Sequence, residues 1–135
     1  MGAWNYGVFD DDTAYDALDD LKASSDIIAD MEWYFDEVIQ TEDVGYDEAQ
    51  YVLVAAAVMD SVINDTQYRC DGEDYFEWTR SQKSLDFSAL RQKAVKAIDA
   101  VLSDNSELRE LWEENKELYE AWREDKCSIQ KRLQQ

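Results

Sequence analysis

The sequence predicts an all-α protein, a single-domain bundle of about five helices with an extended aromatic N-terminal strap packed across them. Three observations support this prediction. The chain has no proline and only four glycines, so little interrupts a periodic segment. Apolar residues recur at spacings of three and four along most of it. Its 135 residues, 45% of them hydrophobic, can bury a core, and we expect residues 1–135 to form one domain.

The first nine residues, MGAWNYGVF, form the predicted N-terminal strap (residues 1–9). Trp4 and Phe9 are expected to reach inward and anchor the strap. Small residues would let its backbone lie close to the helices, namely Gly2, Ala3 and Gly7. The aspartates that follow are expected to cap a helix, because an N-cap carboxylate accepts hydrogen bonds from the unpaired N–H groups of the first turn.

The first two helices are predicted by their apolar spacing. Residues 12–22, DTAYDALDDLK, predict a short amphipathic helix capped by one of the aspartates at 10–12. Its apolar positions fall at i, i+3, i+4 and i+7, namely Ala14, Ala17, Leu18 and Leu21. A second helix is predicted after Ser24 and Ser25, over residues 27–39, with acids on its other face.

The third helix is predicted over residues 47–63, with Asp47 as its N-cap. Residues 51–59 are apolar without interruption, so we expect this helix to be the buried centre of the bundle. A β-strand is the competing interpretation because of the valines, but three successive alanines and the total length favour a helix. Nine apolar residues are too few to span a bilayer.

An irregular loop is predicted over residues 64–84, with room for one short helix. Its aromatic residues Tyr75, Phe76 and Trp78 are expected either to cover the core or to contact a partner.

Two more helices complete the predicted bundle. One covers residues 85–102, and a long final helix runs from about Glu107. Asn115 and Lys126 interrupt the apolar stripe of the final helix, which favours a helix that spans the bundle over a coiled coil. Three tryptophans on helix seams are expected to fill the core, namely Trp33, Trp112 and Trp122.

The charge of the chain is strongly acidic and unevenly distributed. There are 32 acidic against 13 basic residues, a net charge of −19. Residues 1–75 hold 20 of the acids and only two of the bases, Lys22 and Arg69. Such a field repels nucleic acids and anionic membranes and accelerates association with a basic protein. We therefore expect a basic protein partner, with no direct nucleic-acid or membrane binding.

The residue types present argue against an enzyme. There is no histidine, which removes the commonest general base and imidazole metal ligand. Cys70 and Cys127 lie far apart, form no CxxC pattern and are expected to be reduced. The N-terminus lacks the features of a signal peptide, so a cytoplasmic location is expected. We expect no catalytic residue, no cofactor and no metal site.

The opening MGAWNYGVFDDDTAYDAL resembles the start of a bacterial family of domains without an assigned function, which typically begins Met-Gly-Ala-Trp-Gly-x-Gly-x-Phe. The matching residues are Gly2, Ala3, Trp4, Gly7, Phe9, Asp12, Ala14 and Asp16, whereas Asn5 replaces the usual glycine. The resemblance continues in EAQYVLVAAAVM and SELRELWEENKELYEAW and covers nearly the whole chain. It implies no enzyme activity, and some relatives look like small helical immunity proteins of bacterial toxin systems.

These observations predict a cytoplasmic immunity or inhibitor protein that binds and neutralises a basic bacterial toxin domain, such as a nuclease, through its acidic surface. The acids expected to contact the partner are Asp10, Asp11, Asp16, Asp19, Asp20, Asp36, Glu37, Glu42 and Asp43.

Two alternatives remain open from the sequence. One is a magnesium-dependent nucleotide hydrolase built on glutamates three residues apart in the final helix, such as Glu114 and Glu117. The other is an acidic adaptor or nucleic-acid mimic, which would bind several basic proteins. Such hydrolases need a second acidic pair on a facing helix, and Asp16 with Asp19 is only a weak candidate for it, so a solvated helix face is the preferred interpretation of the glutamates.

Overall fold

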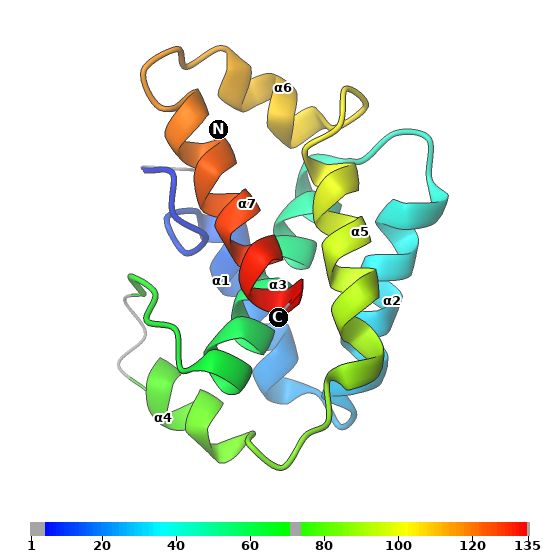
Figure 1. The fold of residues 1–135 in the computed structure, drawn as a ribbon, viewed down its shortest axis with the longest axis vertical. Helices are drawn as coiled ribbons and strands as arrows, with labels where there is room; N and C mark the ends of the chain where they lie inside the picture. The colour runs from blue at the N-terminus through cyan, green and yellow to red at the C-terminus, as the bar shows by residue number, and fades with distance from the viewer. Residues whose placement is uncertain (1–4, 71–73, 135) are drawn as a thin grey trace.

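The computed structural model describes residues 5–70 and 74–134, and within these ranges all regular structure is helical (Figure 1). The predicted all-α class is confirmed, but the described chain forms seven α-helices and one short 3-10 helix instead of about five helices. They are α1 Asp12–Ala23, α2 Ile27–Gln40, α3 Tyr46–Asn64, α4 Tyr75–Ser81, η1 Ser88–Leu90, α5 Arg91–Val101, α6 Glu107–Glu113 and α7 Tyr119–Gln134.

Helix α3 forms the centre of the molecule, as its uninterrupted apolar run predicts. It contacts α1, α2, α4, α5, α6 and α7, and every residue from Val52 to Met59 is buried (Figure 1). Its N-cap is Gly45, so the prediction of Asp47 as the cap is wrong. A Cβ at Gly45 would meet the carboxylate of Glu48, which is the end of a flexible, exposed side chain that can move aside, so the position does not require glycine.

Helices α1 and α2 both begin at an aspartate cap. The side chain of Asp11 accepts a hydrogen bond from the Thr13 N–H at 2.7 Å, and that of Asp26 accepts one from the Ala29 N–H at 3.1 Å. In α1 the four predicted core positions, Ala14, Ala17, Leu18 and Leu21, are all buried. The prediction that one of the aspartates at 10–12 caps the first helix is therefore confirmed. The second cap directly follows the serine pair at 24–25.

Only part of the predicted N-terminal strap lies within the described residues, because Trp4 is outside them. The described part follows bends and a turn, with the Asp10 N–H donating to the Gly7 carbonyl at 3.2 Å, so it does not take the expected extended course. Phe9 reaches inward as predicted: it is buried, and its ring lies edge-on to that of Tyr75, with 5.0 Å between centroids.

The predicted loop over 64–84 contains the short helix α4. Asp65 ends α3 in the left-handed conformation, with φ of 56°. Tyr75 is completely buried, and its hydroxyl lies 2.9 Å from the Ser61 hydroxyl. Phe76 and Trp78 are half-buried against the core. The structure thus places Tyr75 in the core and the other two aromatic residues at its edge.

The prediction of one long final helix from Glu107 is wrong, because the chain turns between α6 and α7. Asn115 causes this break. Its carbonyl accepts hydrogen bonds from the N–H groups of Leu118 and Tyr119, and its side-chain oxygen accepts a second one from Leu118. The turn lets Trp112 stack on Trp122, with ring centroids 5.9 Å apart, and both are buried as predicted.

The helix predicted over residues 85–102 is shorter than expected. It begins with η1 and continues as α5. Five apolar residues at helical spacing along it are all buried, namely Leu90, Ala94, Ala97, Ile98 and Val101. Two hydrogen bonds of 2.9 Å join Val44 to the Asn105 carbonyl and the Glu107 N–H, so the α2–α3 connection is tied to the α5–α6 connection.

Candidate functional site

Six of the nine predicted partner-binding acids are exposed. Asp16, Asp19 and Asp20 lie on α1, Glu37 lies on α2, and Glu42 and Asp43 lie between α2 and α3. Within the described chain none of the six forms an ion pair with a lysine or arginine. These side chains are available to a basic partner.

Asp10 and Asp11, two of the predicted partner contacts, are buried and serve the fold. Asp10 accepts a hydrogen bond from the Gly7 N–H at 3.1 Å, and the carboxylate lies so close to this backbone that a Cβ at Gly7 would come within 2.6 Å of it. Asp11 caps α1 and also accepts a short hydrogen bond from the hydroxyl of Tyr46. A buried carboxylate needs hydrogen-bond donors of this kind inside the fold, and at such a depth a binding protein cannot reach it.

Asp36 is already engaged within the molecule. Lys93 of α5 lies 3.0 Å from its carboxylate and 3.1 Å from that of Glu32, and these two hydrogen-bonded acids raise the pKa of the lysine. This pair of contacts ties α2 to α5. Lys93 partly neutralises Asp36, so this acid contributes less to the negative potential around the protein than an unpaired acid would.

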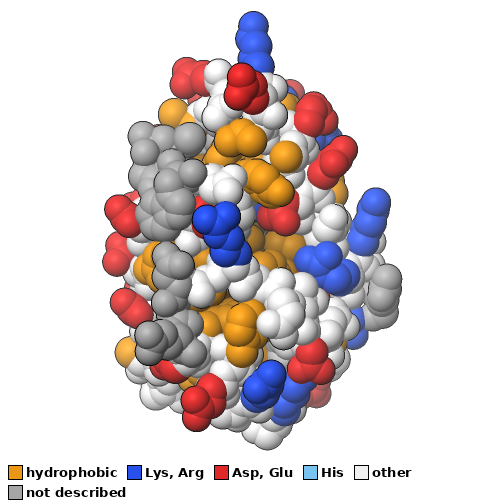
Figure 2. Space-filling model, turned by 90° about the vertical axis from the view of Figure 1, so that its left-hand side faces the viewer, with side chains coloured by type: hydrophobic (Ala, Val, Ile, Leu, Met, Phe, Trp, Pro, Cys, Tyr) orange, Lys and Arg blue, Asp and Glu red, His pale blue; other side chains and the backbone are white. Residues whose placement is uncertain are grey.

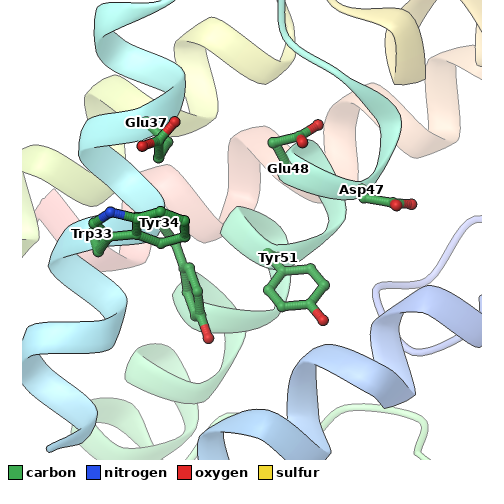
Figure 3. A pocket seen from close by; sticks show the side chains of 6 residues that line it. All are labelled: Trp33, Tyr34, Glu37, Asp47, Glu48 and Tyr51. Carbon is green, nitrogen blue, oxygen red and sulfur yellow. The ribbon is translucent and has the colours of Figure 1, made fainter.

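A groove of about 250 Å³ lies between α2 and α3 and combines aromatic rings with carboxylates (Figure 3). Its lining residues are Trp33, Tyr34 and Glu37 from α2, and Asp47, Glu48 and Tyr51 from α3. Trp33 is 62% exposed, which overturns the prediction that it fills the core. Large exposed aromatic residues on a monomer surface mark interaction sites more often than isolated small apolar ones do.

The rings in the groove are held by contacts with each other. The Tyr34 and Tyr51 rings meet edge to face with 5.2 Å between centroids, and the Trp33 indole meets Tyr34 at 5.9 Å and 69°. The Tyr51 hydroxyl donates a 2.8 Å hydrogen bond to Asp20 of α1. Three helices therefore fix the aromatic part of the groove.

The acids of α1 extend the groove into a larger surface. Partial burial raises the pKa of Tyr34, and the nearby Asp30 and Asp20 raise it further. Burial also raises the pKa of Tyr51, together with the hydrogen bond to Asp20 and the charge of Asp16. We call the groove residues together with Asp16, Asp19 and Asp20 the acidic face. Residues 12–64, which form α1 to α3, contain fourteen acids and one base, Lys22.

The side of the molecule shown in Figure 2 differs from the acidic face. Lysine and arginine side chains gather there among the acids and around exposed apolar side chains. In the sequence, residues 76–135 are likewise mixed in charge, with 12 acids and 11 bases. A uniformly negative field therefore belongs to the α1–α3 half of the molecule.

Two buried charged clusters were not predicted from the sequence. In the first, Lys126 of α7 is 1% exposed and donates to the Tyr6 carbonyl at 2.8 Å and to Asp125 at 2.6 Å. Burial lowers the pKa of this lysine, while the charges of Asp125 and Asp10 oppose that effect. The only signal in the sequence was a lysine at a core position of the apolar stripe.

The second cluster surrounds Asp60 of α3, which is completely buried. Its carboxylate accepts hydrogen bonds from the Tyr68 hydroxyl at 2.5 Å, from Arg132 at 2.8 Å and from Asn64 at 2.8 Å. Burial and the Asp60 carboxylate raise the pKa of Tyr68. The three donors on this carboxylate come from α3, the following loop and α7. The cluster therefore holds these three segments together and serves the fold.

The glutamate pairs considered for the magnesium hydrolase are only partly preserved. Glu110 and Glu113 lie together on α6, whereas Glu117 lies in the turn between α6 and α7 and does not share a helix face with Glu114. Within residues 5–70 and 74–134, no group of three or more aspartate, glutamate or cysteine side chains is placed to hold a metal ion. Cys70 and Cys127 form no disulfide.

The fold and the site define an all-helical domain with an acid-lined aromatic groove on its surface. No described helix combines the length and the apolar character that a membrane crossing requires. The chain belongs to the family described as a domain of unknown function (DUF4259), whose family model matches residues 2–125. Neither the curated proteins nor the solved structures gave a match. The match agrees with the expected resemblance to a family without an assigned function over nearly the whole chain.

Proposed function

We propose that this protein is a cytoplasmic immunity or inhibitor protein that binds a basic bacterial toxin domain, such as a nuclease, and neutralises it. It acts by binding, without catalysis, cofactor or metal. The observation that carries the proposal is the acidic face. It combines the exposed Trp33 with exposed acids that form no ion pair within the described chain.

The charge distribution supports a basic protein as the ligand. The surfaces of nucleases that contact phosphates are basic, so an acidic protein can occupy such a surface and exclude the nucleic acid. Long-range attraction between opposite fields also raises the association rate. A toxin must be neutralised before it acts, so a fast association is the property that an immunity protein needs.

The aromatic groove supports a specific contact in addition to the charge. Binding energy in protein interfaces is concentrated in a few residues, with tryptophan, tyrosine and arginine most frequent among them. Trp33, Tyr34 and Tyr51 provide such residues within the acidic face. This feature favours one partner over the general binding of basic proteins expected for an adaptor or mimic.

The experiment first searches the neighbouring genes for a large secreted protein with a small basic C-terminal domain, which the proposal expects, and then tests neutralisation in bacteria that express this domain. Wild-type protein is expected to restore growth. The face variant Asp16→Lys, Asp19→Lys and Asp47→Lys is expected to lose protection. The control variant Glu114→Lys, Glu117→Lys and Glu120→Lys changes the net charge equally, away from the groove, and is expected to keep it.

These two variants are matched in other respects. All six acids are exposed, and each set contains one first-turn acid, Asp47 of α3 or Glu120 of α7, so each variant loses one favourable helix-dipole interaction. No protection by the wild-type protein would refute the proposed function. Equal protection by both variants would refute the acidic face as the binding surface.

A further inference from the structure

We propose that the groove between α2 and α3 binds one arginine side chain of the partner. This inference rests on the proposed function and names the chemistry of its central contact. The groove volume of about 250 Å³ lies below the ~300–1,000 Å³ of sites for drug-sized ligands, so it fits a single side chain.

Each wall of the groove carries an aromatic ring and a carboxylate at helical spacing. On α2, Glu37 follows Trp33 by four residues, and on α3, Tyr51 follows Glu48 by three, so each pair shares a helix face. Figure 3 shows the rings at one level of the groove and the Glu37 and Glu48 carboxylates at the next. A cation that enters between the walls meets ring surface and carboxylate oxygens together.

The groove carboxylates have no internal counterion. Within the described chain, no lysine or arginine forms an ion pair with Glu37, Asp47 or Glu48. On the same helix α2, in contrast, Lys93 satisfies both Glu32 and Asp36. The groove therefore keeps an unbalanced negative charge beside an exposed indole, which is the environment that attracts a cation to an aromatic face.

An arginine fits this arrangement better than a lysine. Its planar guanidinium can stack on an indole while its N–H groups donate to carboxylates in the ring plane, and it is more weakly hydrated than an ammonium group. Trp33 offers this surface because its edge-to-face contact with Tyr34 holds the indole while 62% of the residue stays exposed. Glu37, one turn further along the same helix face, supplies the carboxylate.

The test uses the full chain, labelled with nitrogen-15, and three blocked peptides that differ only in the central residue of a glycine sequence. The central residue is arginine, lysine or citrulline, which has nearly the shape of arginine without its charge. The arginine peptide is expected to shift the indole N–H signal of Trp33 in a saturable way, with millimolar affinity. The lysine peptide is expected to bind about threefold more weakly, and the citrulline peptide not at all.

Variants assign the binding to the groove. Glu37→Gln is expected to weaken binding of the arginine peptide about fivefold. Trp33→Ala is expected to abolish binding, followed in this variant by the backbone amide signals of α2 and α3. The remote, exposed Glu117→Gln is expected to change nothing. Melting curves should coincide for all four proteins, because these side chains are exposed. The absence of a saturable Trp33 shift, or equal binding of the citrulline peptide, would overturn the inference.

Two further outcomes separate this inference from the proposed function. If the toxin domain is neutralised equally well by wild-type protein and Trp33→Ala, the arginine site is wrong and the inhibitor function stands. If the arginine peptide binds at Trp33 but no neutralisation occurs, the site stands and the function is wrong. Concentration-dependent dimerisation that Trp33→Ala abolishes would assign the groove to a second copy of the chain and overturn the inference.

Discussion

Lys126 is a charged side chain placed in the interior of the molecule. Its ammonium group donates to the Tyr6 carbonyl and to Asp125, so it fixes the segment before α1 against α7. Taking a charge out of water is costly, and only the hydrogen bonds and nearby carboxylates offset that cost. Such a residue holds the fold together only as long as its partners remain in place.

Replacing this lysine by an apolar residue of similar length tests its role. Lys126→Met leaves the Tyr6 carbonyl without its donor and removes one of the two positive charges near the buried Asp10, of which Arg69 at 4.0 Å remains. We expect the free energy of unfolding in urea to fall by about 2 kcal/mol. Lys131→Met, at an exposed position of the same helix, is the control and should change it little. Equal stability of the two variants would contradict the structural role of Lys126.

The buried tyrosines predict a loss of stability at alkaline pH. Burial raises the pKa of Tyr68 and Tyr75 above the ordinary value of 10.0, so above that pH the folded chain binds more protons than the unfolded chain. The contribution of these two tyrosines to the free energy of unfolding is therefore fully present below pH 10. It is lost as the pH rises above 10, by about 1.4 kcal/mol per pH unit for each tyrosine.

Urea unfolding at a series of pH values, with Tyr75→Phe for comparison, measures this effect. The variant loses the contact with Ser61 at every pH. Its stability should nevertheless decline less steeply above pH 10, because one of the tyrosines with a raised pKa is removed. Parallel declines in the two proteins would show that Tyr75 ionises normally in the fold.

At the residue scale, burial was predictable only where a side chain lies on a seam between helices. Trp112 and Trp122 face the interior and stack, whereas Trp33 has the same residue type and lies on the outer side of α2. The seam of α2 is formed by Met31, Phe35 and Val38, to which Trp33 does not belong by period. The prediction placed Trp33 in the core because tryptophan is usually buried, although its spacing does not match this seam.

At the scale of elements, the joint between α3 and α7 depends on Asp60 and Arg132. Asp60 is completely buried, and its cationic partner is supplied from a helix distant in the sequence. The Tyr68 hydroxyl, which also binds this carboxylate, adds the loop after α3 to the same joint. Docking of the last helix is thus coupled to the position of that loop.

Removing the arginine should release α7. Arg132→Met leaves an uncompensated buried carboxylate at Asp60, and we expect it to lower the free energy of unfolding by about 3 kcal/mol. Arg123→Met, an exposed position on α7, is the control, with little change expected. Urea titration followed by circular dichroism gives both values. If the two variants unfold at the same urea concentration, the contact between Asp60 and Arg132 contributes nothing to the stability of the fold.

Most helices were predictable, because apolar period and capping residues are local signals. The break between α6 and α7 was not, although Asn115 is a visible interruption of the stripe. An asparagine is tolerated inside a helix at modest cost, so only the hydrogen bonds it forms with Leu118 and Tyr119 reveal that it ends one. Glutamates around it favour helix formation, which conceals the turn in the sequence.

At the scale of the whole molecule, the net charge of −19 opposes compactness. Self-repulsion of the acids is strongest at low ionic strength, where the screening length is about 30 Å at 0.01 M salt against about 3 Å at 1 M. The high charge is therefore a cost to stability that a binding function would explain.

Sodium chloride should stabilise the protein. We expect Tm to rise by about 5 °C between these two salt concentrations, because screening reduces repulsion in the folded state. The control variant with lysine at 114, 117 and 120 has a net charge of −13, three changes of +2 from −19, and should show a smaller rise. A melting temperature independent of salt in both proteins would contradict this account.

The acidic half of the chain was predictable from its composition, but the site within it was not. Six of the nine predicted acids are exposed, yet Asp10 and Asp11 became cap and turn residues, and Asp36 is paired with Lys93. The groove needs α2 and α3 side by side, which no local pattern specifies. Asp47 and Glu48 were thus overlooked, because only tertiary packing brings them opposite Trp33.

The central claim, that the acidic face receives a basic protein, is tested most directly by association kinetics with the toxin domain. We expect the wild-type rate constant to fall steeply as salt is added. The variant with lysine at 16, 19 and 47 should associate about tenfold more slowly and respond less to salt. The variant with lysine at 114, 117 and 120 should stay close to the wild type. Equal slowing of both variants, or of neither, would contradict the claim.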